Sequence, residues 1–115
     1  MTVSAPYREC FLYVDADGVD QVTAELAERL GPARRFHRFD LRGFEIDVVK
    51  NGLRLRDHSD DFIEWSTKVE VDAGTVADAD VVRFVADLMG FLRSRGHRVV
   101  AACDFEDELP QTDLV

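Results

Sequence analysis

Two stretches of the sequence carry apolar residues at helical spacing, and strand-like segments lie before, between and after them. The first stretch runs from Val19 to Leu30 and ends at Gly31-Pro32, because the glycine favours a left-handed cap and the proline cannot continue a helix. The second ends at Gly96, and its apolar stripe consists of Val81, Phe84, Val85, Leu88, Phe91 and Leu92. Amphipathic helices must bury such stripes, so both are predicted to pack against one sheet.

The remaining segments have the composition of strands. Residues 9–14 are apolar on both alternating faces, which is typical of a central strand. Residues 44–48 alternate between apolar and acidic side chains, and a long strand is predicted from Ile63 to Val71. Residues 98–103 form a last strand with small side chains.

The segment from 34 to 50 leaves two folds of the α+β class open. If it is one bent strand, the order is βαββαβ, a ferredoxin-like two-layer α/β sandwich. Arg42-Gly43 allows a bend or bulge within it, and if the segment instead forms a hairpin, the order is βαβββαβ with a five-stranded mixed sheet. In the first case Asp15 and Asp17 share one end of the sheet with the loop 57–61. In the second case the extra strand inverts the chain, and they are expected at opposite ends.

The chain of 115 residues is expected to form a single α+β domain over 1–115, with an acidic tail at 104–115. No apolar run approaches the roughly 18 residues that span a bilayer, and the first ten residues do not resemble a secretory signal. We therefore expect a cytoplasmic protein without a membrane partner. In that compartment Cys10 and Cys103 are predicted to be reduced, small core residues that could be neighbours across a sheet.

The charge is acidic and unevenly distributed. Lys and Arg number 14 against 23 Asp and Glu, which gives a formal net charge of -9. Residues 29–56 hold eight bases and three acids, so the negative charge is concentrated in the remainder. This balance argues against general nucleic-acid binding, whose affinity comes from neutralising phosphates. It favours a basic partner instead.

The side chains that carry chemistry are scattered along the chain. His37, His58 and His97 lack the spacing of metal ligands, and no phosphate-binding glycine run is present. We therefore predict no metal, no cofactor and no catalytic residue set. His58 lies beside Asp57 in a polar loop, where a solvated histidine is the simplest interpretation.

The acidic tail is the most distinctive segment. Phe105 and Leu109 are four residues apart, so a short helical turn would anchor both to the core and display the acids between them. The run Ala-Ala-Cys-Asp-Phe-Glu-Asp-Glu-Leu-Pro at 101–110, preceded by Phe62-Ile-Glu-Trp65 and Val69-Glu-Val71, resembles a family of small uncharacterised actinobacterial proteins. The resemblance spans most of the chain and implies one intact domain, with no known activity.

These features lead to a non-enzymatic, acidic protein-binding module as the main functional hypothesis. More concretely, we predict an immunity protein or antitoxin-like inhibitor that covers a basic toxin domain, with carboxylates pairing the Lys and Arg residues of that partner. The predicted partner-binding residues are Asp57, Asp60, Asp61, Asp104, Glu106, Asp107 and Glu108.

Two alternatives remain open. The first is a dimeric ligand-binding or regulatory ferredoxin-like domain, which predicts a homodimer and apolar residues such as Phe11, Tyr13 or Trp65 on an exposed sheet face. The second is a small enzyme, which requires a pocket where Tyr13, His37 or His58 converges with a carboxylate.

Overall fold

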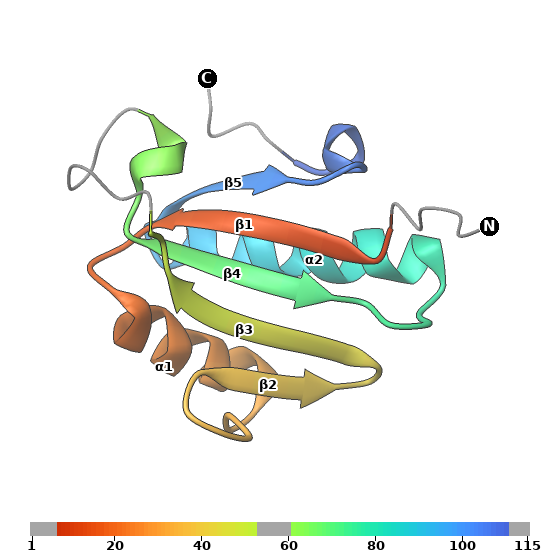
Figure 1. Ribbon diagram of the computed structural model, residues 1–115, viewed down its shortest axis with the longest axis horizontal. Helices are drawn as coiled ribbons and strands as arrows, with labels where there is room; N and C mark the ends of the chain where they lie inside the picture. The colour runs from red at the N-terminus through yellow and green to blue at the C-terminus, as the bar shows by residue number, and fades with distance from the viewer. Residues whose placement is uncertain (1–6, 53–60, 111–115) are drawn as a thin grey trace.

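The computed structural model of the protein describes residues 7–52 and 61–110 (Figure 1). Its described part is a sheet with both α-helices on one side, the α+β two-layer sandwich that the sequence predicts. In chain order the elements are β1 (Glu9–Asp15), α1 (Val19–Leu30), β2 (Arg38–Leu41), β3 (Phe44–Lys50), the 3₁₀-helix η1 (Phe62–Glu64), β4 (Thr67–Asp72), α2 (Asp78–Ser94), β5 (Arg98–Ala102) and the 3₁₀-helix η2 (Glu106–Glu108).

The strand order in the sheet is β2-β3-β4-β1-β5, and every neighbouring pair is antiparallel. The elements β1, α1, β3, β4, α2 and β5 follow the βαββαβ order, and β2 is added outside β3 as a fifth, edge strand. The five-stranded alternative is therefore the one that forms. Its sheet is antiparallel throughout, so the expected mixed sheet was wrong.

A tight turn at Arg42 and Gly43 makes the hairpin between β2 and β3. Both residues have positive φ, 51° and 90°, as a type I′ turn requires, and Leu41 pairs with Phe44 on either side. Such turns match the twist of the flanking strands and usually carry Asn, Asp or Gly at both central positions. Arginine at the first position obscures that signal, which is why the sequence left the bent strand open.

The connection from α1 to β2 returns the chain to the end of the sheet where α1 begins. His37, at the close of this connection, contacts Thr23 of the first half of α1, with 2.9 Å between the Thr23 Oγ1 and His37 Nδ1 atoms. The carbonyl of His37 accepts a hydrogen bond from the N–H of Val48 in β3. This return absorbs the reversal that the extra strand would otherwise impose, so β3 runs in the same direction as β1.

The chain direction decides which loops meet. The hydroxyl of Ser66, just before β4, donates to the carbonyl of Ala16, just after β1. The end of β1 and the segment that precedes β4 therefore lie at the same end of the sheet. The expectation that a five-stranded fold would put Asp15 and Asp61 at opposite ends was wrong, because it omitted the return of the chain between α1 and β2.

The core lies between the sheet and the helices. Alternate residues of β1, β3 and β4 point at the helices, and α1 and α2 contribute apolar stripes at three- and four-residue spacing. Burying each of these side chains contributes roughly 1.5–3 kcal/mol. Neither helix is long and apolar enough to cross a membrane. The largest fully buried side chains are Leu12, Val14, Val22, Leu26, Ile46, Val48, Val69, Val81, Val85, Leu88, Met89 and Leu92.

The strand predicted from Ile63 begins later, at Thr67, because residues 62–64 form η1. The carboxylate of Asp61 caps η1 by accepting a hydrogen bond from the N–H of Ile63, at 3.3 Å. The buried side-chain amide of Asn51 donates to the carbonyls of Ile63 and Trp65, at 2.7 and 2.8 Å. These bonds satisfy backbone groups that a longer strand would have paired.

The left-handed glycine of the hairpin turn gives a direct test of this fold. A Cβ added at Gly43 would lie 3.0 Å from the side chain of Val76, at a backbone conformation that other residues rarely adopt. We expect Gly43→Ala to lower the free energy of unfolding by about 1–3 kcal/mol. Gly90→Ala is the matched control, since that glycine lies in α2 with open space around it. This substitution should raise the free energy of unfolding by about 0.5–1 kcal/mol. Urea unfolding of both variants measures the difference, and equal effects would contradict the turn.

Candidate partner-binding surface

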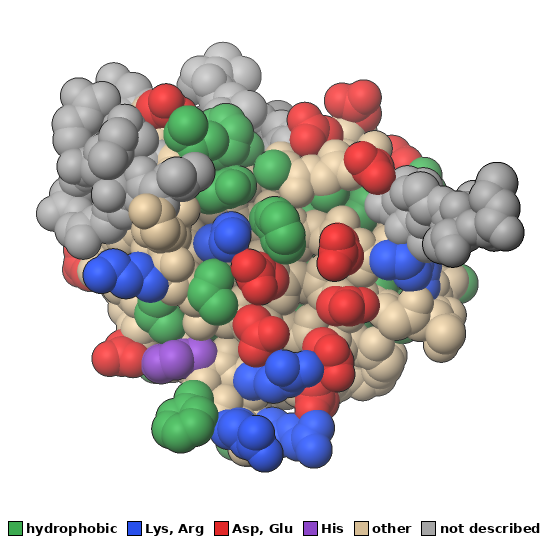
Figure 2. Space-filling view, viewed as in Figure 1, with side chains coloured by type: hydrophobic (Ala, Val, Ile, Leu, Met, Phe, Trp, Pro, Cys, Tyr) green, Lys and Arg blue, Asp and Glu red, His purple; other side chains and the backbone are tan. Residues whose placement is uncertain are grey.

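The helices leave one face of the sheet open. Figure 2 views this face, and acidic side chains gather across its middle and right, with basic side chains mainly at the lower edge and the left. The residues that point to this face are those that alternate with the core positions of each strand. The open face is therefore defined by the same alternation that builds the core.

Carboxylates from four strands form one row across the open face. Asp40 of β2 pairs with Glu45 of β3, Glu45 with Asp72 of β4, and Asp72 with Glu9 of β1. Neighbouring strands are about 4.8 Å apart, so each carboxylate has another acid on the adjacent strand. A second, shorter row pairs Asp47 of β3 with Glu70 of β4. We call these residues the acidic face: Glu9, Asp40, Glu45, Asp47, Glu70 and Asp72.

Basic side chains from β2 and the preceding segment neutralise one edge of the acidic face. The Arg38 guanidinium lies 2.9 Å from a carboxylate oxygen of Glu45, 3.6 Å from one of Asp47 and 3.7 Å from one of Asp40. The nearby charge of Asp47 and the hydrogen bond to Glu45 raise the pKa of Arg38 above its usual value. The pKa of the Asp40 carboxyl is lowered, mainly because Arg34 donates a hydrogen bond to it.

The other half of the acidic face has less compensation. Lys68 approaches Glu70 at 3.3 Å. The carboxylate of Asp72 accepts a hydrogen bond from the N–H of Gly74 at 3.0 Å, and among the described residues neither Asp72 nor Glu9 forms an ion pair. Negative charge is thus least neutralised where β4 and the start of β1 lie side by side.

The predicted anchored turn in the tail is confirmed. Phe105 and Leu109 are 2% and 7% exposed, and the three acids of η2 between them are exposed. The Phe105 ring stacks on that of Tyr7, with 5.2 Å between ring centroids. The Tyr7 hydroxyl donates to the Glu108 carboxylate, and this bond raises the pKa of Tyr7. We call Asp104, Glu106, Asp107 and Glu108 the acidic ridge.

The acidic ridge lies at the end of the sheet crossed by the row of four carboxylates. β5 pairs with β1 from Arg98 to Ala102, and Ala102 lies opposite Phe11. From there the chain continues directly into the ridge. Glu9 lies at the same end of β1. Figures 1 and 2 show η2 beside the start of β1, with acidic side chains near both. Face and ridge together therefore form an extended negative surface.

The other predicted partner-binding residues do not join this surface. Asp61 lies at the opposite end of the sheet, where it caps η1. Asp57 and Asp60 are outside the described residues, as is His58. Of the seven predicted residues, the structure brings together the four of the ridge. Sequence reasoning missed the acidic face, because its rows exist only once the strands are paired.

The aromatic side chains on the open face are partly covered. The Lys68 ammonium lies 4.7 Å from the centroid of the Phe11 ring, and the Tyr13 ring packs edge-on against Phe62 at 5.3 Å. Trp65 is only 2% exposed, with the Arg98 guanidinium 4.8 Å from its ring centroid. The predicted exposure of Trp65 on a sheet face was therefore wrong.

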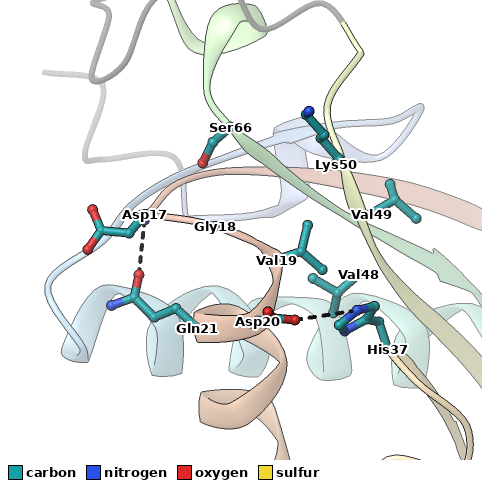
Figure 3. A pocket seen from close by; sticks show the side chains of 10 residues that line it. All are labelled: Asp17, Gly18, Val19, Asp20, Gln21, His37, Val48, Val49, Lys50 and Ser66. Atoms are coloured by element: carbon teal, nitrogen blue, oxygen red, sulfur yellow. Dashed lines mark hydrogen bonds and ion pairs between the residues drawn. The ribbon is translucent and has the colours of Figure 1, made fainter.

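A pocket of about 800 Å³ opens beside the N-terminus of α1 (Figure 3). His37 lines it, with its Nε2 atom 3.5 Å from a carboxylate oxygen of Asp20. Ser66 and Lys50 lie across the pocket from His37 in Figure 3, and the Ser66 hydroxyl is engaged by the carbonyl of Ala16. Tyr13 does not line this pocket. Of the three residues that the enzyme hypothesis named, His37 is therefore the one that lies beside a carboxylate in this pocket, and His58 is outside the described residues.

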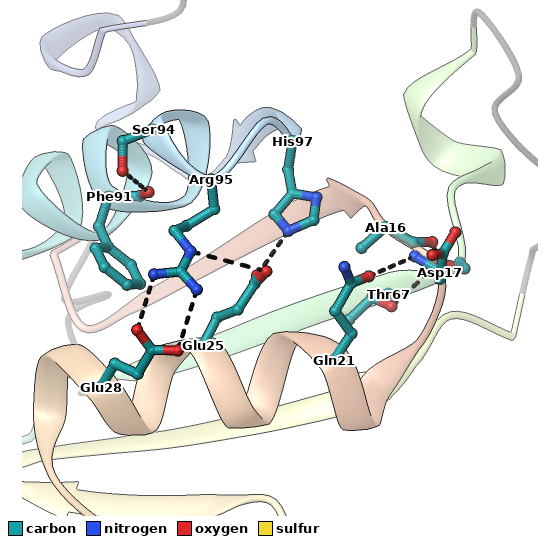
Figure 4. Close-up of polar contacts among 11 residues, drawn as sticks. Ala16, Asp17, Gln21, Glu25, Glu28, Thr67, Phe91, Ser94, Arg95 and His97 are labelled. Carbon is teal, nitrogen blue, oxygen red and sulfur yellow. Dashed lines mark hydrogen bonds and ion pairs between the residues drawn. The ribbon is translucent and has the colours of Figure 1, made fainter.

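A polar cluster that sequence reasoning missed joins α1 to the turn between α2 and β5 (Figure 4). His97 Nε2 lies 2.6 Å from Glu25 Oε1, and both side chains are nearly buried, 7% and 12% exposed. Arg95 binds the Glu28 carboxylate through two nitrogen atoms, at 2.8 and 3.1 Å. The arrangement ties α1 to the C-terminal end of α2 and the turn that follows it. Within the described ranges, no group of three or more His, Cys, Asp or Glu side chains could hold a metal ion.

Searches against protein-family models, curated proteins and solved structures found no match for this chain. The resemblance to small actinobacterial proteins therefore stays a prediction. The surfaces described above are interpreted from their geometry and charge.

The in-register acids predict that the sheet is electrostatically strained. Like charges directly opposite on neighbouring strands are destabilising, and Asp72 has an acid on each side. Asp72→Asn removes the charge but keeps an oxygen that can accept from Gly74. We expect it to raise the free energy of unfolding by about 0.2–1 kcal/mol at low salt, and by less at high salt.

The control for this prediction is Asp87→Asn, which removes an acid that binds Arg29 on the helical side. It should be neutral or slightly destabilising. Urea unfolding at low and high ionic strength compares the two variants. A loss of stability in Asp72→Asn at low salt would show that the row is not repulsive.

Proposed function

We propose that this chain is a non-enzymatic protein-binding module of the cytoplasm whose acidic face and acidic ridge cover a basic surface of a partner protein. Its most specific form is an immunity protein or antitoxin-like inhibitor that blocks the functional surface of a basic toxin domain. Inhibition in this form is steric: the partner's Lys and Arg side chains pair with carboxylates and are hidden from their own target.

The row of Asp40, Glu45, Asp72 and Glu9 is the observation that carries this proposal. A sheet face that served only as a solvated surface would gain stability from alternating or polar residues at these positions. Acids on adjacent strands instead repel one another in the free protein. A basic partner would relieve that repulsion on binding. The arrangement therefore lowers the stability of the free protein and contributes to affinity in a complex.

The acidic ridge suits the same partner. Buried Phe105 and Leu109 hold η2 against the domain, so the ridge does not have to be ordered when a partner binds. Asp104 and Asp107 form no hydrogen bond or ion pair with the described part of the chain and can turn toward a ligand. A concentrated negative field also accelerates encounter with a basic protein.

The dimeric alternative is less well supported. Two copies that paired through their open faces would bring acidic residues against acidic residues, and Trp65, one of the apolar residues expected there, is buried. A ligand-binding role is compatible with the pocket beside α1, where Asp17, Asp20, His37 and Lys50 offer mixed charge. No arrangement in that pocket selects a particular ligand.

The test is a comparison of two variants with the same change in net charge. The face variant combines Glu9→Gln, Glu45→Gln and Asp72→Asn, whereas the control variant combines Asp20→Asn, Asp80→Asn and Asp87→Asn on the helices. Proteins retained by the immobilised wild-type chain from a lysate of its own cells are identified, and the best-retained one is purified for titration calorimetry. We expect one basic partner, with binding weakened about tenfold or more in the face variant and little changed in the control.

The ridge is tested separately with Asp104→Lys and Asp107→Lys, which leave the hydrogen-bonded Glu106 and Glu108 in place. This variant should also weaken binding, and raised salt should weaken the wild-type complex. A partner that binds both triple variants equally, or a retained protein that is not basic, would contradict the proposed function.

A further inference from the structure

The two cysteines lie side by side at the end of the sheet that carries the acidic ridge. Phe11 of β1 and Ala102, the last residue of β5, form the final in-register pair, and Cys10 precedes Phe11 while Cys103 follows Ala102. In-register residues on antiparallel strands have Cα atoms about 4.5–5.5 Å apart, which is within the range of about 4.4–6.8 Å that a disulfide spans. Both residues pack against the core, and both are free thiols.

The two thiols interact with each other. The Cys10 thiol donates a hydrogen bond to the Cys103 sulfur, which lowers the pKa of Cys103. The backbone N–H of Phe105 is a second donor to that sulfur, while burial and the charges of Glu106 and Asp104 act in the opposite direction. The same contact, together with burial, raises the pKa of Cys10. Of the two thiols, Cys103 is therefore the one that gives up its proton more readily.

The two cysteines also differ in solvent exposure, and this difference again favours reaction at Cys103. Cys10 is 2% exposed within the core cluster, whereas Cys103 is half-buried at the start of the segment that leads into η2. A small oxidant meets the Cys103 sulfur first, because the neighbouring Cys10 is buried. An accessible thiolate backed by a protected thiol is the arrangement that directs oxidation toward a disulfide rather than toward irreversible acids.

We propose that Cys103 and Cys10 form a reversible redox pair, with Cys103 as the sulfur that reacts with hydrogen peroxide and Cys10 as the resolving thiol. The Cys103 thiolate attacks one peroxide oxygen, the O–O bond breaks, and hydroxide leaves as Cys103 becomes a sulfenic acid. The Cys10 sulfur then attacks the Cys103 sulfur. The S–S bond forms, the S–O bond breaks, and the hydroxyl group leaves with the Cys10 proton as water.

The disulfide would connect β1 to the base of the acidic ridge. The N–H of Cys103 donates to the Glu106 carboxylate at 3.2 Å, so the oxidised residue is the one that orients the first acid of η2. The bond would also close a loop that contains both helices and the strands β2, β3 and β4. We expect oxidation to raise the midpoint temperature of unfolding by on the order of 10 °C.

The test exposes the reduced chain to hydrogen peroxide and follows both sulfurs. Free thiols are counted after denaturation, and peptide masses locate any cross-link. We expect both thiols to be lost together, with a Cys10–Cys103 peptide pair lighter by two hydrogen atoms and fully restored by dithiothreitol. If Cys103 proceeds to sulfinic acid or to a dimer while Cys10 stays reduced, the proposal is overturned.

Two variants assign the roles. In Cys103→Ala, Cys10 should resist peroxide in the folded protein. In Cys10→Ala, the sulfenic acid on Cys103 should accumulate and be trapped by dimedone. Alkylation of Cys103 by iodoacetamide at neutral pH should also slow in Cys10→Ala, because less of the residue is present as thiolate. The rate should fall by about threefold rather than tenfold for each tenfold loss of thiol acidity, since the thiolate of a weaker acid is more nucleophilic.

Circular dichroism checks that each variant is folded. If only one of the two folds, its comparison with the wild type is sufficient to test the proposal. Oxidation of Cys10 at the wild-type rate in Cys103→Ala would overturn the assigned order. An alkylation rate of Cys103 that is unchanged in Cys10→Ala would overturn the hydrogen bond between the thiols. Neither result depends on whether the chain binds a basic partner.

Discussion

The antiparallel register of β3, β4 and β1 is the constraint on which the rest of the structure depends. Successive side chains of a strand point to opposite faces, so a shift of one residue would exchange the two sets. In the observed register, Ile46, Val71 and Cys10 point at the helices. Their neighbours Glu45, Asp72 and Glu9 then point to the open face. The core and the acidic face are therefore two consequences of one pairing.

This pairing balances opposed electrostatic and hydrophobic effects. Burial of the apolar sets contributes roughly 1.5–3 kcal/mol per large side chain, whereas each like-charged pair across strands costs about 0.2–1 kcal/mol. Hydrophobic burial therefore fixes the register even though it aligns the acids. Arg38 reduces the repulsion at the β2 edge, and the β4–β1 side keeps its negative field. The surface that is least compensated is the one that we propose for a basic partner.

Local signals in the sequence were sufficient for the helices, for most of β1, β3, β4 and β5, and for the anchored tail. The apolar spacing of α1 and α2 predicted both elements, and the four-residue separation of Phe105 and Leu109 predicted the turn that displays the ridge. These features depend on residues that are close in the chain. The alternation of β3 and β4 predicted which of their residues share a face, but not which residues of another strand lie beside them.

Features that depend on distant pairing could not be predicted in the same way. The row from Asp40 to Glu9 joins four strands, and the contact of Glu25 with His97 joins positions 72 residues apart. The hairpin at Arg42-Gly43 was left open because an arginine stands at a left-handed position. The predicted separation of Asp15 from Asp61 failed because the path of the segment between α1 and β2 has no distinctive sequence pattern.

The most direct test of the negative surface is an NMR titration of the isotope-labelled chain with a hexalysine peptide at low salt. This titration maps where a basic ligand binds, and it does so without the natural partner. We expect amide shifts to change first along β3, β4 and the start of β1 and in η2, and added salt to reverse the changes. Changes that centre on α1 and α2, or that spread evenly over the acids of the whole chain, would contradict a binding role for the acidic face and ridge.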